Sequence, residues 1–339
     1  MAVFTCHSVA LTGLIGELIS VEVDIAEGLP GFTLLGLPDT SLYESRERVR
    51  TAISNSNFKW PNRKTTVSLS PAWLPKAGPG FDLSIAIAIL GSQGVIREDR
   101  IEKTIFLGEL GLDGTVKSVR GILPSLVAAK KFGVTKAIIP FANFLESKYL
   151  SGIEIVPVSS LIYLVNYLNT GELNEFEITE PISKKYLPDM AEVAGQHHAK
   201  KLIEISAIGG HNLLLIGPPG TGKTMLAERL PTILPELDLD AALEVAAIHS
   251  IAGTNQISER QFKTPPFIAP HHTSTSVAMI GGGSSWIKPG SVSLAHRGIL
   301  FIDEAPECAR VVLDALRQPL ESGVVLISRA LGSINFRAK

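Results

Sequence analysis

Eight consecutive residues have the types and spacing needed to hold a phosphate group. The segment Gly217-Pro218-Pro219-Gly220-Thr221-Gly222-Lys223-Thr224 matches the pattern G-x-x-x-x-G-K-[ST]. Glycines let the backbone curl so that its N–H groups face a phosphate, and the start of a following helix adds a positive end. We expect Lys223 to reach the β- and γ-phosphates and the Thr224 hydroxyl to bind Mg²⁺. A glycine-rich loop that binds nothing is the alternative, which the apolar run before the loop and the helical run after it disfavour. The predicted nucleotide-binding residues are Gly217, Pro218, Pro219, Gly220, Thr221, Gly222, Lys223, Thr224 and Met225.

Two adjacent carboxylates end an apolar run further along the chain. The run Ile299-Leu300-Phe301-Ile302 leads directly into Asp303 and Glu304. We expect Asp303 to hold Mg²⁺ through water or through Thr224, and Glu304 to polarise the water that attacks the γ-phosphate. Such an acidic strand end is more often structural when it stands alone, but a phosphate loop makes it the expected partner. The predicted catalytic residues are therefore Lys223 and Glu304, and the predicted metal-binding residues are Thr224 and Asp303.

Apolar runs must form the elements that position these groups. Residues 212–216 lead into the phosphate loop, and residues 299–302 lead into the two carboxylates. Uninterrupted apolar runs of this kind are typical of strands in a buried parallel sheet. A helix-compatible run, 225–230, follows the loop. The segment from 190 to 339 therefore predicts an α/β domain.

Residues 1–169 mix short strand-like runs with helical segments and predict a separate α+β domain. Residues 21–25 alternate with period two, which indicates a half-buried strand. Residues 123–132 read as a helix ended by a glycine, and residues 136–140 read as a buried strand after it. The polar stretch 170–189, with its two prolines, predicts a linker between the two domains.

Composition and charge exclude several classes of protein. The 339 residues are 45% hydrophobic and carry a net charge of −2. Both halves can therefore bury a core, and the charge balance gives no evidence of overall attraction to nucleic acid or anionic lipid, while it leaves a local basic patch open. The two cysteines, Cys6 and Cys308, build neither a disulfide framework nor a cysteine-rich zinc site, and they suit a reducing compartment. The N-terminus lacks a basic region, and the longest apolar run is far shorter than the ~20 residues of a membrane-spanning helix. We therefore expect a cytoplasmic protein with no membrane partner.

These motifs and their surroundings resemble the AAA+ ATPases, specifically the magnesium-chelatase-like YifB/ComM group of bacteria. The resemblance rests on residues 209–224, Ala269–Ser274, the triglycine 281–283, Leu316–Glu321 and Ile327–Ala330. It implies ATP and Mg²⁺ as ligands and ATP hydrolysis as the activity. It also implies assembly into a ring, a hexamer in the full-length form, and motor action on DNA. The action implied is branch migration in recombination and natural transformation.

The N-terminal segment resembles the Lon-protease-like domain of the same group, without its catalytic pair. Gly80 stands where active Lon proteases place a serine, and Leu123 stands where they place a lysine. Acyl transfer needs both a nucleophile and a base, so we predict a non-proteolytic domain that serves assembly or engages DNA. An alternative alignment would pair Ser84 with Lys130.

The resemblance also implies parts that would follow Lys339. In the family a sensor strand, an arginine finger and a helical lid come after this position, so we expect an AAA+ core that is truncated before sensor 1 and the lid. Nucleotide binding is then better supported than turnover. Two alternative functions remain open, which are a nucleotide-binding adaptor without turnover and a metal-chelatase motor subunit.

Two smaller features have competing interpretations. The neighbours His271 and His272 lack a third clustered ligand, so we favour a structural role or DNA contact over a metal site. Residues 322–339 predict a hairpin with Arg329 near its tip and Arg337 on its return strand. Related motors line their central pore with such a hairpin, but a solvated sheet edge carries arginines as well.

Overall fold

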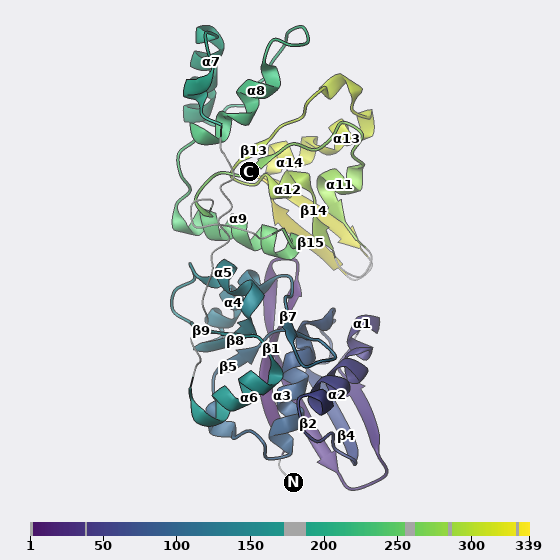
Figure 1. Ribbon diagram of the computed structural model, residues 1–339. Helices are drawn as coiled ribbons and strands as arrows, with labels where there is room; N and C mark the ends of the chain where they lie inside the picture. The colour runs from purple at the N-terminus through teal and green to yellow at the C-terminus, as the bar shows by residue number, and fades with distance from the viewer. Residues whose placement is uncertain (1–2, 38, 173–187, 255–261, 284–286, 330–331) are drawn as a thin grey trace. The chain divides into compact units, whose positions relative to one another are not determined.

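The computed structural model describes residues 3–37, 39–172, 188–254, 262–283, 287–329 and 332–339 (Figure 1). The chain divides into two compact units: unit 1 comprises residues 1–179 with 250–255, and unit 2 comprises residues 180–249 with 256–339. Most of the predicted linker, residues 173–187, lies outside the described residues. The domain boundaries at 169 and 190 therefore stay predictions.

A seven-stranded mixed sheet forms the centre of unit 1, with the strand order β3-β4-β2-β1-β5-β8-β9. Strand β2 pairs antiparallel with β1 and β4, whereas the pairings β3–β4, β1–β5, β5–β8 and β8–β9 are parallel. The strands predicted at 21–25 and 136–140 are confirmed as parts of β2 and β8. The strand bounds are β1 Phe4–Thr12, β2 Ile15–Ala26, β3 Gly31–Leu35, β4 Lys64–Ser70, β5 Thr104–Phe106, β8 Lys136–Pro140 and β9 Glu154–Val158, with a small hairpin of β6 Glu109–Leu110 and β7 Val116–Lys117.

Helices cover both faces of this sheet, as the alternation along its strands demonstrates. On β1, Cys6 lies in the apolar cluster that contains helix α3, and Val9 lies in the cluster that contains helix α4. On β8, Ile138 belongs to the first cluster and Ile139 to the second. Successive side chains of a strand point to opposite faces, so the two clusters lie on the two sides of one sheet. The helices of unit 1 are α1 Thr40–Tyr43, α2 Ser45–Asn55, α3 Asp82–Ser92, α4 Ile122–Lys131, α5 Phe144–Ser147 and α6 Leu161–Thr170.

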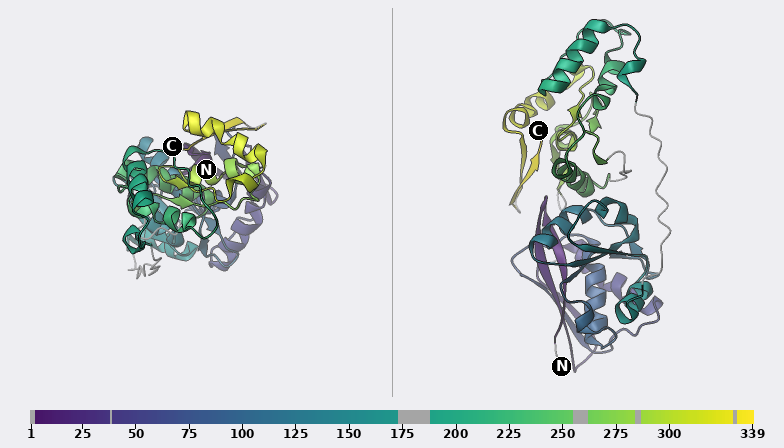
Figure 2. Two further views of the ribbon diagram at one scale, coloured as in Figure 1. Left: turned by 90° about the horizontal axis from the view of Figure 1, so that it is seen from above. Right: turned by 90° about the vertical axis from the view of Figure 1, so that its left-hand side faces the viewer.

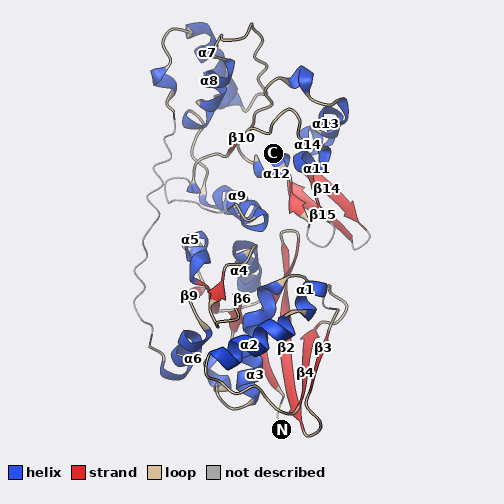
Figure 3. Ribbon diagram, turned by 45° about the vertical axis from the view of Figure 1, so that its right-hand side comes forward, coloured by secondary structure: helices blue, strands red, loops and turns tan. Residues whose placement is uncertain are grey.

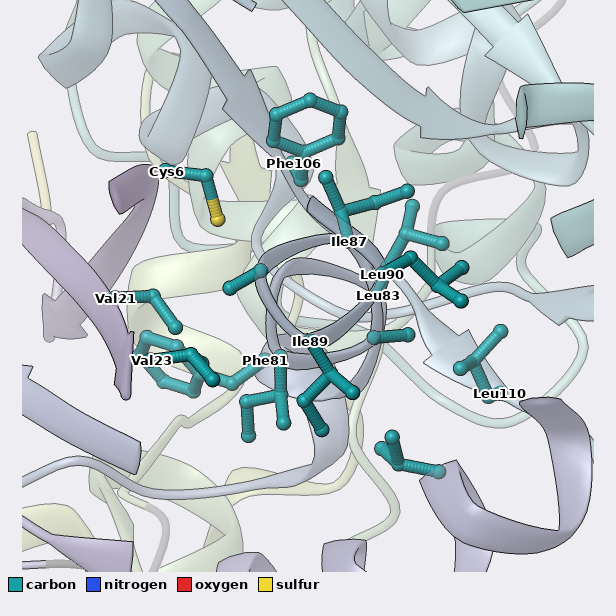
Figure 4. Close-up of a cluster of buried hydrophobic side chains, with 14 of the residues drawn as sticks. Cys6, Val21, Val23, Phe81, Leu83, Ile87, Ile89, Leu90, Phe106 and Leu110 are labelled. Carbon is teal, nitrogen blue, oxygen red and sulfur yellow. The ribbon is translucent and has the colours of Figure 1, made fainter. Parts of the chain in front are cut away.

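Helix α3 is buried on all sides. Each residue from Leu83 to Leu90 is at most 1% exposed, and the helix runs beside the long strands β1 and β2 (Figure 2, right). Figure 4 shows Cys6, Val21 and Phe106 among the apolar side chains around it. A helix that is apolar all round belongs in a core. No helix among the described residues is both long and apolar enough to cross a membrane.

A buried ion pair joins the start of α3 to α2. Nε of Arg48 donates to Oδ2 of Asp82 at 2.7 Å, and a second guanidinium nitrogen donates to Oδ1 at 3.0 Å. The Asp82 side chain is fully buried and also accepts from the backbone N–H of Leu110. Burial raises the pKa of Asp82, although Arg48 acts to lower it. The carboxylate therefore depends on Arg48 for its compensating charge.

Unit 2 consists of helices and short strand pairs. Strand β10 pairs in parallel with β13, and β11 pairs antiparallel with β12. Strands β14 and β15 form an antiparallel hairpin (Figure 3). The hairpin predicted within 322–339 is confirmed by this pairing. The strand bounds are β10 Phe267–Ile268, β11 Gly281–Gly282, β12 Lys288–Pro289, β13 Ile299–Leu300, β14 Val324–Arg329 and β15 Gly332–Arg337. The helices are α7 His197–Gly209, α8 Lys223–Glu228, α9 Leu239–Ala252, α11 Ser276–Ile280, α12 Ser291–Leu294, α13 Arg310–Ala315 and α14 Arg317–Ser322. Residues 250–252 at the end of α9 are counted with unit 1.

The strand predicted at 212–216 is wrong. Leu214 and Ile216 are 78% and 87% exposed, and the segment pairs with no strand in the described part of the chain. The strand predicted at 299–302 is shorter than expected, since β13 covers Ile299–Leu300. An apolar run forms a strand only where a neighbouring strand supplies hydrogen-bond partners for its backbone. The composition of the run does not reveal whether such a strand exists. Within the described residues, the parallel sheet predicted for this domain is reduced to the β10–β13 pair.

The Arg48–Asp82 pair leads to a stability prediction. Replacing Arg48 with Met leaves the Asp82 carboxylate buried without a counter-charge, which we expect to cost about 3–5 kcal/mol of unfolding free energy. Because Arg48→Met with Asp82→Leu removes both charges, we expect the double variant to lose less than Arg48→Met alone. Urea unfolding followed by circular dichroism measures both losses.

A matched control is Arg97→Met, because Arg97 pairs with Asp99 and the two side chains are 72% and 58% exposed. We expect that change to cost at most about 1 kcal/mol. Equal losses for Arg48→Met and Arg97→Met would contradict the structural role of the buried pair.

Candidate nucleotide-binding site

The phosphate loop leads into α8, which an apolar cluster holds in place. Gly220 and Gly222 adopt φ angles of +78° and +84°, a left-handed conformation that glycine tolerates. Leu226 of α8 packs in a cluster with Val193 and Ile203, and Ile299 of β13 packs against the same cluster. The cluster thus places the end of the loop beside the strand that precedes the two carboxylates.

Lys223 folds back over its own loop. Its Nζ donates to the carbonyl oxygen of Gly217 at 2.9 Å and to that of Pro218 at 3.0 Å. The Thr221 hydroxyl donates to the same Pro218 carbonyl at 2.9 Å, and Gln196 Nε2 donates to the Thr221 carbonyl at 3.2 Å. These contacts close the loop. Charged phosphate oxygens accept stronger hydrogen bonds than neutral carbonyls do, so the ammonium can exchange its carbonyl partners for them.

Thr224 and Asp303 meet in the structure, although they are 79 residues apart in the sequence. The Thr224 hydroxyl donates to Oδ2 of Asp303 at 2.9 Å. The other carboxylate oxygen, Oδ1, accepts from the backbone N–H of Glu304 at 3.0 Å. A hydroxyl and a carboxylate side by side are oxygen donors of the kind that Mg²⁺ takes together with water and substrate phosphates. The residues present therefore fit a magnesium ion.

Glu304 follows in a different environment. Its backbone adopts φ +50°, which is unusual for a residue other than glycine, and its side chain is 65% exposed. Nδ1 of His272 lies 3.5 Å from Oε2 of Glu304. The sequence favours a structural role or DNA contact for His272 over a metal site, and it gives no sign of this neighbour. In the described part of the chain, no group of three or more His, Cys, Asp or Glu could hold a metal ion.

In unit 1 the structure does not bring the alternative Ser–Lys pair together. The Ser84 hydroxyl is buried on α3 and donates to the carbonyl of Phe81, whereas Lys130 of α4 donates to the carbonyl of Ser151. These two helices cover opposite faces of the sheet. Leu123, at the expected lysine position, is fully buried. The absence of proteolytic activity stays a prediction.

A second charged cluster, which the sequence did not indicate, surrounds Glu244 of α9. Its carboxylate lies 2.6 Å from Arg337 of β15, 3.3 Å from His296 Nε2 and 3.5 Å from Arg297. His296 is buried, and its Nδ1 accepts from the backbone N–H of Lys339 at 3.1 Å, so its Nε2 carries the proton and donates to Glu244. Arg337, predicted on the return strand of the hairpin, therefore has a partner within unit 2. The side chain of Arg329 lies outside the described residues.

Burial and charge act in opposite directions on the titration of this cluster. Burial alone would raise the pKa of Glu244, but the hydrogen bond from His296 and the charges of Arg337 and Arg297 lower it below its ordinary value. Burial lowers the pKa of His296, and Glu244 opposes that change only in part. Both pKa values are thus lower than in an unfolded chain.

Comparison with known families adds to this geometry. The family model "Magnesium chelatase, subunit ChlI" matches residues 189–339, and the model "Subunit ChlI of Mg-chelatase" matches residues 21–143. The first range contains the phosphate loop, both carboxylates and the Glu244 cluster. The second range covers much of the large sheet of unit 1.

Several curated proteins are similar over the whole chain. An uncharacterized protein of Mycobacterium tuberculosis is 45% identical over 341 residues, which cover 100% of this chain and 68% of that protein. Competence protein ComM of Haemophilus influenzae is 42% identical over 345 residues, and the uncharacterized protein YifB of Escherichia coli is 42% identical over 340 residues. Each match covers 100% of this chain and 67% of the relative. Lon protease 2 of Bacillus subtilis is 35% identical over 163 residues, 43% of this chain and 29% of that protease.

The Glu244 cluster predicts how stability depends on pH. Arg337→Gln removes a charge that lowers the pKa of Glu244, so we expect a loss of up to about 1 kcal/mol of unfolding free energy above the ordinary glutamate pKa. A depressed carboxylate pKa stabilises the fold above its unfolded value and ceases to do so as the pH falls through the folded value. The difference between wild type and variant should therefore shrink below pH 4.5, the ordinary value. Urea unfolding at pH 7 and at successively lower pH measures it.

Arg310→Gln is the matched control, because the Arg310 side chain is 92% exposed and its contact with Asp314 is 3.8 Å long. We expect no resolvable change at any pH. A difference for Arg337→Gln that stays constant down to acid pH would contradict the assigned link to Glu244.

Proposed function

Because the chain belongs to the YifB/ComM family of magnesium-chelatase-like proteins, we propose that it binds ATP with Mg²⁺ and hydrolyses ATP as a motor acting on DNA. The observation that carries the proposal is the 2.9 Å hydrogen bond between Thr224 and Asp303. Each of the two motifs has a structural interpretation when it stands alone. The contact between them supports a proposal in which both motifs bind the same nucleoside triphosphate.

Each residue of the site has a distinct role in this proposal. Lys223 binds the β- and γ-phosphate oxygens, and the backbone from Gly217 to Met225 surrounds the phosphates, with N–H donors at every residue except the two prolines. Thr224 and Asp303 hold Mg²⁺, which when bound offsets the negative charge of the phosphates. Glu304 orients the attacking water and accepts its proton.

We propose DNA as the partner and branch migration in recombination as the work done. Support comes from the similarity, along the whole chain, to a protein named competence protein ComM. We further propose that copies of the chain assemble into a hexameric ring in the cytoplasm. In this proposal residues 1–169 form a Lon-like domain without proteolysis, 170–189 a linker, and 190–339 the ATPase core.

The first functional prediction concerns binding. Lys223→Ala removes a charge-assisted hydrogen-bond donor worth roughly 1.5–3 kcal/mol, so the affinity for ATP with Mg²⁺ should fall by about tenfold or more. Isothermal titration calorimetry measures the dissociation constants. Lys201→Ala is the matched control, because Lys201 is an exposed lysine on α7, and it should bind as wild type does. Equal affinities for wild type and Lys223→Ala would contradict the assignment of the loop.

The second functional prediction concerns turnover and its partner. Glu304→Gln keeps the size of the side chain but removes the base, so phosphate release should fall to background while the ATP affinity stays unchanged. For the wild type, we expect forked DNA to stimulate phosphate release. Stimulation by a porphyrin substrate instead of DNA would favour the metal-chelatase alternative. Tight ATP binding without any phosphate release would favour the adaptor alternative.

A further inference from the structure

The close approach of His272 to Glu304 has no role in the function proposed above. Nδ1 of His272 lies 3.5 Å from Oε2 of Glu304. We propose that His272 is a positioning residue, which fixes the direction of the Glu304 carboxylate and thereby the water that this carboxylate orients. The inference rests on the proposed ATP hydrolysis, and it adds a residue to that same site.

The pairing of two strands explains why these side chains meet. Strands β10 and β13 run in parallel, with Phe267 opposite Ile299 and Ile268 opposite Leu300. Beyond this pairing, the backbone N–H of Phe301 donates to the carbonyl of Ile268 at 2.9 Å. His272 lies as many residues after Phe267 as Glu304 lies after Ile299, the residue paired with Phe267. Parallel strands end at the same sheet edge, so both residues leave the sheet at the same point.

The His272 ring has a neighbour that limits its orientation. The rings of His271 and His272 have centroids 4.1 Å apart, with an angle of 33° between their planes. Nδ1 of His271 accepts from the backbone N–H of Thr273 at 3.3 Å and lies 2.8 Å from the Thr273 hydroxyl. His271 is therefore tied to its own turn, and its ring supports one side of His272.

Among the residues that the structure describes, His272 is the charged or polar side chain placed near the Glu304 carboxylate. The Glu304 side chain is 65% exposed, whereas both oxygens of the adjacent Asp303 accept hydrogen bonds. The left-handed backbone of Glu304, φ +50°, is of a kind that clusters at functional sites. A distance of 3.5 Å is longer than a good hydrogen bond, so a small side-chain rotation makes or breaks the contact. With Nδ1 engaged at Oε2, the other oxygen, Oε1, is left for the water.

The test compares three variants in phosphate release and in ATP affinity. His272→Ala should lower kcat about ten- to a hundredfold while the dissociation constant for ATP stays unchanged, because only the water is misplaced. His272→Asn should restore most of kcat, because an asparagine amide nitrogen takes the place of Nδ1. His272→Gln should not, because its amide nitrogen corresponds to Nε2. Unchanged kcat in His272→Ala, or equal rescue by Asn and Gln, would overturn the proposal.

A measurement without turnover separates this inference from the proposed function. In ¹⁵N-histidine-labelled protein, the resonance of His272 Nδ1 is assigned by its loss from the spectrum of His272→Asn. Glu304→Gln should shift this resonance. Glu307→Gln, a change of an exposed carboxylate on the same turn, should leave it in place. If the Nδ1 resonance of His272 does not shift in Glu304→Gln, the contact between the two side chains is overturned. A wild type that releases no phosphate would count against the proposed hydrolysis, while a shifted resonance would still support the contact.

Discussion

The candidate site depends on the hydrogen bond between the Thr224 hydroxyl and the Asp303 carboxylate. It joins the helix that follows the phosphate loop to the segment that follows β13, and the apolar cluster around Leu226 and Ile299 brings those elements together. Without that packing the loop would still have its glycines and its lysine, but no carboxylate beside it. The oxygen donors suited to a magnesium ion exist only because two distant segments are held against each other.

The two units bury their polar side chains to very different degrees. In unit 1 a sheet covered on both faces encloses α3, and the charged group at the start of that helix is fully buried and paired. In unit 2 Thr224 and Glu304 are exposed and positioned by polar contacts. A phosphate ligand needs an accessible loop, so the groups that would bind it are held by hydrogen bonds and by the apolar side of α8 rather than by enclosure.

Local patterns predicted some elements well and others badly. Alternation and helix-end residues predicted β2, β8, α4 and the β14–β15 hairpin, because these signals act within a few residues of the chain. The run at 212–216 failed as a strand, since apolar composition cannot identify the strand that would pair with it. The pairing of the two motifs predicted that Asp303 would act together with Thr224, and the two side chains are 2.9 Å apart in the structure. Nothing in the sequence indicated that Glu244 would pair with Arg337, because that contact joins α9 to β15 and depends on tertiary packing alone.

The adjacent carboxylates of Asp303 and Glu304 show how position separates two residues of similar chemistry. Both oxygens of Asp303 accept hydrogen bonds, one from a side chain and one from the backbone, so its direction is set. Glu304 has a longer side chain and a left-handed backbone, and His272 lies 3.5 Å from one of its carboxylate oxygens, which leaves the other oxygen exposed to a reacting water. A metal ligand needs a set geometry, whereas a group that orients water and takes up a proton must reach the reacting atoms and adjust to them. The different restraints on these neighbours therefore match the different roles proposed for them.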